Sequence, residues 1–310
     1  MRRCLPYHQK PMGGKDMIVR LQHVGLAVEN LEESCAVFER LFGLKARDFR
    51  HDQGKGFQHD TRIMLPNECW LHLVQNWNPE SRVNKFLRTH GEGLEHIALE
   101  TNAIEADVAH LREIGVPIYQ DKIFDAPDGY EAFVYPEDAI GFTVELIQPH
   151  DTSWKFERSK VSNPNILGLQ HIGVAVKDLD KSVRRFERLF GLKASNLRND
   201  QHHGRQKDMT IELGNDRLWL HVVESRVSEH RVAQFIAKYG EGLEHLCFEV
   251  ADIREAVKQV KSADVPLFQN KIYLDREDGF EAFVYPEYTH GVTIELIEPY
   301  PTSRGYRPKS

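Results

Sequence analysis

Apolar residues in this chain gather in short runs, and some of these runs open on a histidine. His23 and His96 each begin such a run, which predicts a strand. A stretch typical of a helix follows each strand, from Asn30 to about Phe42 and over 104–114. Shorter strand-like runs come next, at 62–65, 70–74, 133–135 and 142–147. Each quarter of the chain therefore predicts a strand, a helix and about three more strands.

Such a succession predicts an α+β protein with mostly antiparallel sheets. Asn30 and Asp178 are suited to N-cap two of the helices, and Gly43 and Gly191 to end them. Two further helices are expected near 81–89 and 229–239, where they connect the quarters.

Long blocks of the first half of the chain return in the second. The block Gly91–His96 (GEGLEH) recurs at 240–245, RLFGLKA at 40–46 recurs at 188–194, and EAFVYPE at 131–137 recurs at 281–287. A duplicated domain follows. The boundaries that we expect are a disordered extension at 1–16, a first domain at 17–150, a polar linker at 151–165, a second domain at 166–300 and a tail at 301–310.

Composition limits the function classes. The 310 residues carry a net charge of −7, which argues against nucleic acid as a main partner. No apolar run is long enough to span a membrane, so no membrane partner is expected. The cysteines occupy unmatched positions in the repeat, which indicates no disulfide framework and favours a cytoplasmic location.

A fainter period within each half selects eight residues. The interval between His23 and His96 equals that between His72 and Glu145, and the second half repeats the pattern. A glutamate inside an apolar strand, such as Glu145, is costly to bury without a cation or dense hydrogen bonding. Three imidazoles and one carboxylate suit a divalent ion such as zinc, iron, cobalt, nickel or manganese, at about two per chain. The predicted ligands are His23, His72, His96, Glu145, His171, His221, His245 and Glu295.

The segments around these residues resemble the vicinal oxygen chelate superfamily, most closely its methylmalonyl-CoA epimerase and glyoxalase I groups. The resemblance rests on 22–28, 42–44, 93–98 and 144–149 and covers 20–150 and 168–300. It implies four βαβββ modules, paired into two cupped sheets with one metal per pair. Asp52-Gln53-Gly54 resembles an epimerase motif. The second ligand of the family is usually glutamine or glutamate, whereas this chain has histidine there. Asp60 and Asp208 are the nearest candidates for a second acid or base.

The sequence thus predicts a metal-dependent isomerase, epimerase or lyase that forms an enolate of a small carbonyl-containing substrate, with Glu145 and Glu295 as both ligands and bases. One alternative is an iron(II)-dependent ring-cleaving or 2-oxo-acid dioxygenase, because two histidines and one carboxylate remain without His72 and His221. Another is a non-catalytic protein that sequesters a small molecule.

Two further points stay open at this stage. Modules could pair within each half or between halves, and the second arrangement would give His23/His72/His245/Glu295 and His96/Glu145/His171/His221. The sequence also leaves homodimerisation open.

Overall fold

The computed structural model describes residues 18–52, 56–151, 155–157, 160–200 and 205–303. The predicted extension at 1–16, most of the predicted tail and Gln53-Gly54 of the epimerase-like motif lie outside these residues. Within the described part, no helix is both long and apolar enough to cross a membrane.

The first half contains two strand–helix–strand modules joined by a short helix. Its elements are β1 (Ile18–Ala27), α1 (Leu31–Phe42), β2 (Arg47–Asp52), β3 (Gln58–Leu65), β4 (Cys69–Asn76), α3 (Arg82–His90), β5 (Gly93–Thr101), α4 (Ile104–Glu113), the 3-10 turn η1 (Tyr119–Asp121), β6 (Phe124–Ala126), β7 (Gly129–Val134) and β8 (Thr143–Pro149).

The second half repeats this order. Its elements are β9 (Ile166–Val176), α5 (Leu179–Phe190), β10 (Ala194–Asp200), β11 (Gln206–Glu212), β12 (Trp219–Ser225), α7 (Arg231–Tyr239), β13 (Gly242–Val250), α8 (Ile253–Ser262), η3 (Phe268–Asn270), β14 (Gly279–Val284), η4 (Pro286–Tyr288) and β15 (Thr293–Pro299). The last module lacks a counterpart of β6, and Tyr273 instead makes a single bridge to Glu281.

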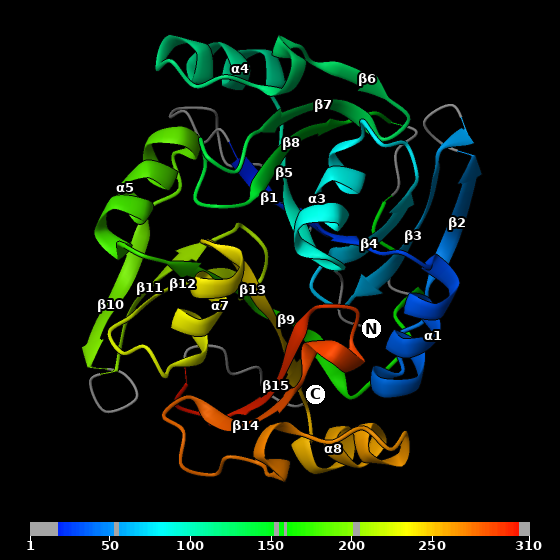
Figure 1. The fold of residues 1–310 in the computed structure, drawn as a ribbon, viewed down its shortest axis with the longest axis vertical. Coiled ribbons are helices and arrows are strands. Elements are labelled where there is room, and N and C mark those ends of the chain that lie inside the picture. Colours follow the sequence, from blue (N-terminus) through cyan, green and yellow to red (C-terminus); the bar gives the residue numbers. More distant parts are fainter. Residues whose placement is uncertain (1–17, 53–55, 152–154, 158–159, 201–204, 304–310) are drawn as a thin grey trace, which may run out of the picture.

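Each half builds one curved sheet from its own strands (Figure 1). The strand orders are β2-β3-β4-β1-β5-β8-β7-β6 and β10-β11-β12-β9-β13-β15-β14. In the first sheet the β1–β4 and β5–β8 pairs are parallel and the remaining pairs are antiparallel. The second sheet repeats this pattern, with β9–β12 and β13–β15 as its parallel pairs. The α+β fold with mostly antiparallel sheets is confirmed, and the modules pair within each half.

The predicted helix ends are also confirmed. The Asn30 side chain accepts a hydrogen bond from the Glu33 backbone, and Asp178 does the same for Lys181. Gly43 adopts a left-handed conformation with a φ of 63°, which glycine tolerates without a Cβ clash.

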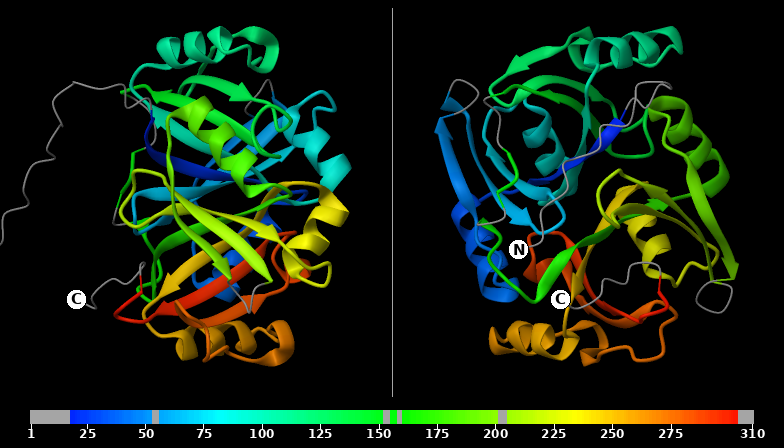
Figure 2. Two further views of the ribbon diagram at one scale, coloured as in Figure 1. Left: turned by 90° about the vertical axis from the view of Figure 1, so that its left-hand side faces the viewer. Right: turned by 180° about the vertical axis from the view of Figure 1, so that it is seen from behind.

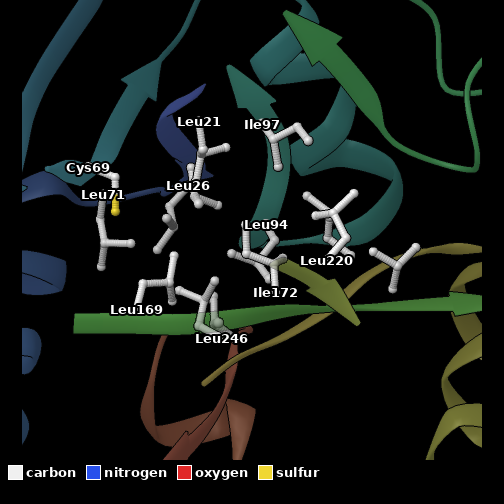
Figure 3. Close-up of a cluster of buried hydrophobic side chains, with 14 of the residues drawn as sticks. Leu21, Leu26, Cys69, Leu71, Leu94, Ile97, Leu169, Ile172, Leu220 and Leu246 are labelled. Atoms are coloured by element: carbon white, nitrogen blue, oxygen red, sulfur yellow. The ribbon is translucent and has the colours of Figure 1, made fainter. Parts of the chain in front are cut away.

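One apolar core joins the two halves. Residues of both sheets belong to a single buried cluster, including Leu26 and Leu71 of the first half and Leu169 and Leu246 of the second (Figure 3). Helix α1 lies beside α8 of the other half, while α4 and α8 occupy opposite ends of the molecule (Figure 1 and Figure 2). Because successive strand residues face opposite ways, the side of β1 that carries His23 faces away from this core.

Candidate metal centre

Four adjacent strands at the middle of each sheet carry the residues selected by the sequence period. In the first sheet β4, β1, β5 and β8 are neighbours and hold, in this order, His72, His23, His96 and Glu145. In the second sheet β12, β9, β13 and β15 hold His221, His171, His245 and Glu295. The residues therefore gather within each half, and the described residues form neither of the sets that would combine both halves.

Three side-chain atoms meet in each cluster. In the first half, Nε2 of His23 lies 3.1 Å from Nε2 of His96, and Oε2 of Glu145 lies 3.3 Å from His96 and 3.7 Å from His23. The second half repeats these distances as 3.0, 3.3 and 3.6 Å. All three side chains of the first cluster are buried.

The recurring His-x-Gly sequence has a steric explanation. Gly25 lies opposite His96 in the β1–β5 pair, and a Cβ at Gly25 would sit 1.9 Å from the His96 ring. Gly173 stands in the same relation to His245, at 2.0 Å. Only glycine leaves room for the imidazole to lie over the neighbouring strand, so these two glycines help to position His96 and His245.

His72 and His221, hereafter the rim histidines, lie at the edge of the two clusters. The ring of His72 meets that of His23 edge-on, with centroids 4.9 Å apart, and it is partly exposed. In the second half Nη2 of Arg198 lies 3.3 Å from Nε2 of His221. A guanidinium can only donate hydrogen bonds, so it competes with a metal ion for this nitrogen. The rim histidines are thus more exposed than the inner pair, and His221 already has a hydrogen-bond donor at Nε2.

A second layer of hydrogen bonds orients the inner imidazoles. Nδ1 of His23 lies 3.0 Å from Oε1 of Gln22, and Nδ1 of His96 lies 2.6 Å from Oε2 of Glu95. Because both partners supply acceptor oxygens, they favour a proton on Nδ1 and leave Nε2 as a lone pair that faces the cluster. Gln170 and Glu244 repeat these contacts in the second half.

The charge on Glu95 is held by a cation behind it. Arg82 donates to Oε2 of Glu95, and Thr143 donates to Oε1 at 3.1 Å. Burial alone would raise the pKa of Glu95, but the charges of Arg82 and His96 lower it to about 2. Glu244 has the same low pKa of about 2, with Arg231 as its cation.

The pKa values of the inner histidines move in opposite directions. Burial, and then the neighbouring His72 and His96, lower the pKa of His23 well below its ordinary value. Burial also opposes the charge of His96, but the carboxylates of Glu95 and Glu145 outweigh it and raise the pKa. The inner histidine of β1 therefore stays neutral near pH 7, as a metal ligand must be.

A second carboxyl group lies beside the cluster glutamate. Glu131 on β7 pairs with Ile147, two residues from Glu145 on β8, so both glutamates share one face of the sheet. Burial, followed by the charge of Glu145, raises the pKa of Glu131 well above its ordinary value. Glu281 stands in the same relation to Glu295, and its pKa is raised for the same reasons.

The residues proposed from the family resemblance as a second acid behave differently. Asp60 is fully buried, and its carboxylate lies 2.6 Å from Nε of Arg50. Although burial opposes ionisation, contacts with His72 and Arg50 lower the pKa of Asp60 to about 2. Asp208 is held by Arg198 at 2.8 Å, and its pKa is lowered too. The two aspartates thus have lowered pKa values, whereas burial and a neighbouring carboxylate raise the pKa values of Glu131 and Glu281.

The second cluster opens into a cavity of about 780 Å³. His171, His221, His245 and Glu295 line it together with Glu281 and Trp219. The Trp219 ring stacks on His171, with centroids 5.9 Å apart and planes inclined by 22°, and Trp70 stacks on His23 in the same way. The two tryptophans thus lie beside the histidine clusters, and Trp219 lines the cavity.

The inner donor sets fit a divalent metal ion. Bonds of about 2.0–2.2 Å to nitrogen and oxygen place neighbouring ligand atoms about 3.0–3.5 Å apart, close to the separations seen here. The carboxylate and the imidazoles are buried, and a buried carboxylate needs a compensating cation. His23, His96 and Glu145 would hold the ion in the first half, and His171, His245 and Glu295 in the second. Each rim histidine has a ring nitrogen within 4.8 Å of those of the two inner histidines, so it is within reach as a further ligand.

Several residues around the clusters escape prediction from the period of the histidines. They are Gln22, Arg82, Glu95, Glu131, Gln170, Arg231, Glu244 and Glu281. Each has an identical partner at the matching position of the other half, and the four glutamates lie in the repeated blocks. The identity of those blocks is the signal that could have identified them, whereas ligand spacing alone could not.

Comparison with known proteins agrees with this architecture. The family described as the Glyoxalase/Bleomycin resistance protein/Dioxygenase superfamily matches residues 22–133 and 170–285. The chain is 26% identical to methylmalonyl-CoA epimerase of Dictyostelium discoideum over 43% of this chain and 83% of that protein. It is 24% identical to lactoylglutathione lyase of Schizosaccharomyces pombe over 66% of each chain.

A solved structure shares the whole fold. A mutant of 4-hydroxymandelate synthase from Streptomyces coelicolor superposes with a TM-score of 0.69 at 17% identity, covering 94% of this chain and 95% of that one. Similarity at this level of identity concerns the fold. Both halves of the chain thus have counterparts in a single known architecture.

Proposed function

Because this chain belongs to the Glyoxalase/Bleomycin resistance protein/Dioxygenase superfamily, we propose that it is a metal-dependent isomerase, epimerase or lyase acting on a small carbonyl-containing substrate. Members of the superfamily include epimerases, lyases and dioxygenases, and they typically use divalent metal ions. Its relatives by sequence include an epimerase and a lyase, which supports the isomerase side of the family.

One observation carries the proposal. Two carboxyl groups, Glu295 and Glu281, line the same cavity beside the donor cluster, and their surroundings separate their proton affinities. Histidine contacts overcome burial and lower the pKa of Glu295, while burial and the Glu295 charge raise that of Glu281. Two neighbouring carboxyl groups whose pKa values are shifted in opposite directions are suited to act as a base and an acid.

The residues divide the reaction between them. A divalent ion held by the inner histidines and the glutamate would supply Lewis-acid polarisation of the substrate carbonyl. Glu295 removes the proton from the carbon beside that carbonyl, and the electron pair moves onto the carbonyl oxygen. Glu281 returns a proton to the same or the adjacent carbon. Glu145 and Glu131 hold the equivalent positions in the first half.

Proton exchange tests the proposal directly. The chain loaded with cobalt(II) or zinc is incubated in D₂O with methylmalonyl-CoA, with the adduct of methylglyoxal and glutathione, and with related 2-substituted thioesters. Loss of the signal from the proton next to the carbonyl is followed by ¹H NMR. We expect metal-dependent exchange with at least one of these compounds. A metal-loaded chain that exchanges none of them would refute the isomerase assignment.

The contact between Arg198 and His221 favours a second candidate. If this contact keeps Nε2 of His221 from the ion, two histidines and one carboxylate remain, which is the donor set of iron(II) oxygenases. An iron(II)-dependent ring-cleaving or 2-oxo-acid dioxygenase is therefore the alternative. Oxygen consumption by the iron-loaded chain with catechols and 2-oxo acids distinguishes it from the isomerase.

A further inference from the structure

The two halves differ at a position next to the rim histidines. Arg62 on β3 pairs with His72 on β4, and Thr210 on β11 pairs with His221 on β12. Directly paired residues of a sheet project to the same face, so Arg62 and Thr210 stand next to the rim histidines. A long cation in the first half is replaced by a short neutral side chain in the second.

The partners of these residues change with them. Asp48 on β2 binds Nε of Arg62 at 2.7 Å, and Asn196 on β10 donates to Oγ1 of Thr210 at 3.1 Å. Asp48 and Asn196 are equivalent, since each adopts a left-handed backbone, with φ of 57° and 55°. A charged pair in one half therefore corresponds to a neutral pair in the other. Changing only one residue of either pair would leave its partner without a matching group.

Arg62 is held firmly in the first half. Only 2% of the residue is exposed, and its guanidinium lies 5.6 Å from the centre of the Trp70 ring. The linker covers it from the other side, because Nη1 donates to the Lys155 carbonyl at 3.2 Å and Lys160 binds Asp48 at 2.7 Å. Moving this guanidinium out of its site would leave the buried charge of its partners uncompensated, which is strongly unfavourable. The Arg62 side chain therefore fills the space beside Trp70.

The same space is open in the second half. Thr210, Asn196 and Ser195 line the cavity of about 780 Å³, as do Trp219 and His221. The three short side chains bond to one another, because Nδ2 of Asn196 donates to Oγ of Ser195 at 2.8 Å and to Oγ1 of Thr210 at 3.1 Å. They present hydroxyl and amide groups, which can donate or accept hydrogen bonds, next to an indole face.

We propose that Ser195, Asn196 and Thr210 form a substrate subsite in the second half and that Arg62 fills the equivalent subsite in the first. The second half then accepts a carbonyl compound whose substituent extends along Trp219, and its polar walls favour an uncharged group with hydrogen-bonding atoms. The first half accepts only a compact ligand. That the ligand is a carbonyl compound rests on the proposed function, whereas the difference in size rests on Arg62 and Thr210.

Two chelating probes of unequal size test this difference. The full chain is loaded with cobalt(II) and titrated with acetohydroxamate, which is compact, or with benzohydroxamate, which carries a phenyl ring, by calorimetry and cobalt absorption. We expect about two equivalents of the compact probe and about one of the larger probe per chain. Equal stoichiometry for both probes overturns the subsite proposal. Absence of bound metal, or of proton exchange alone, would instead count against the proposed function.

Exchanged pairs give the matched controls. Arg62→Thr with Asp48→Asn should raise the stoichiometry of benzohydroxamate to about two per chain. Thr210→Arg with Asn196→Asp should reduce the affinity for benzohydroxamate at least about tenfold. Both exchanges conserve net charge, and metal content and acetohydroxamate binding should stay as in the parent chain. Unchanged benzohydroxamate binding in a folded exchange variant overturns the proposal. If the Arg62→Thr, Asp48→Asn variant fails to fold, the Thr210→Arg, Asn196→Asp variant and the titration of the parent chain still test the proposal.

Discussion

Replacing Glu95 by glutamine should destabilise the metal-free chain in a pH-dependent way. Glu95 is 3% exposed, and Arg82 and His96 lower its pKa from 4.5 to about 2. A pKa lowered by this amount corresponds to about 3 kcal/mol of stabilisation of the folded state. Glutamine keeps the shape of the side chain and one acceptor oxygen but removes the charge, so this contribution should disappear.

The sign of the pH dependence follows from the direction of the shift. A carboxyl whose folded pKa is depressed stabilises the chain fully above its unfolded pKa, here 4.5. The contribution is lost as pH falls toward about 2, so it should decline from about 3 kcal/mol at pH 6 to about half of that near pH 3. In the parent chain the raised pKa of His96 keeps it protonated over this range, so the pH dependence of the parent between pH 6 and 3 follows Glu95.

Urea unfolding followed by circular dichroism, with EDTA present, measures the difference between parent and variant at pH 6, 5, 4 and 3. The matched control is Glu39→Gln, which makes the same chemical change in an exposed pair with Lys45. Exposed pairs contribute little, so the control should change stability by less than about 0.5 kcal/mol. A Glu95→Gln difference that is constant from pH 6 to 3, or no larger than that of the control, would refute the reasoning.

Three further predictions concern the centres and the fold. Glu145→Gln with Glu295→Gln should lower proton exchange by about 10²–10⁴-fold while metal affinity falls moderately, and full activity in a metal-loaded variant would refute the base assignment. Elemental analysis of chain purified without chelator should find about two metal ions, and one or none would contradict the paired centres. Because one core joins the halves, fragments 17–150 and 166–300 should be insoluble alone but soluble when co-expressed, and two soluble monomeric fragments would contradict this.

The sequence predicts the fold well because the chain is repetitive. Each module shows the same succession of strand, helix and strands, and helix ends such as Asn30 and Gly43 carry local signals that the structure confirms. The sequence cannot decide how the modules pair, since both pairings bury the same apolar faces. Strand order decides it, through hydrogen bonds such as those between β1 and β5, which are not encoded in any short motif.

Prediction of the candidate site is limited in a different way. The period of the histidines identifies side chains that strands bring to one face, so the clusters around His23 and His171 could be anticipated. Arg82 could not, because it lies on helix α3 and reaches Glu95 on the separate strand β5. Glu131 could not either, since only the pairing of β7 with β8 places it beside Glu145. A residue that acts through another residue, or across a strand pair, cannot be recognised from regular spacing in the sequence.

The repeat supplies a comparison that a single sequence otherwise lacks. Residues that contact the inner imidazoles are the same in both halves, such as Gln22 with Gln170 and Glu95 with Glu244. The pair next to the rim histidines differs, with Arg62 in place of Thr210. The second cluster also has Cys247 beside His171 and Glu295, where the first half has Ala98. The histidine and glutamate donors are the same in both halves, and the exchange of Arg62 for Thr210 changes the space that a ligand would occupy. Selection between the halves by ligand size and polarity therefore follows from that exchange.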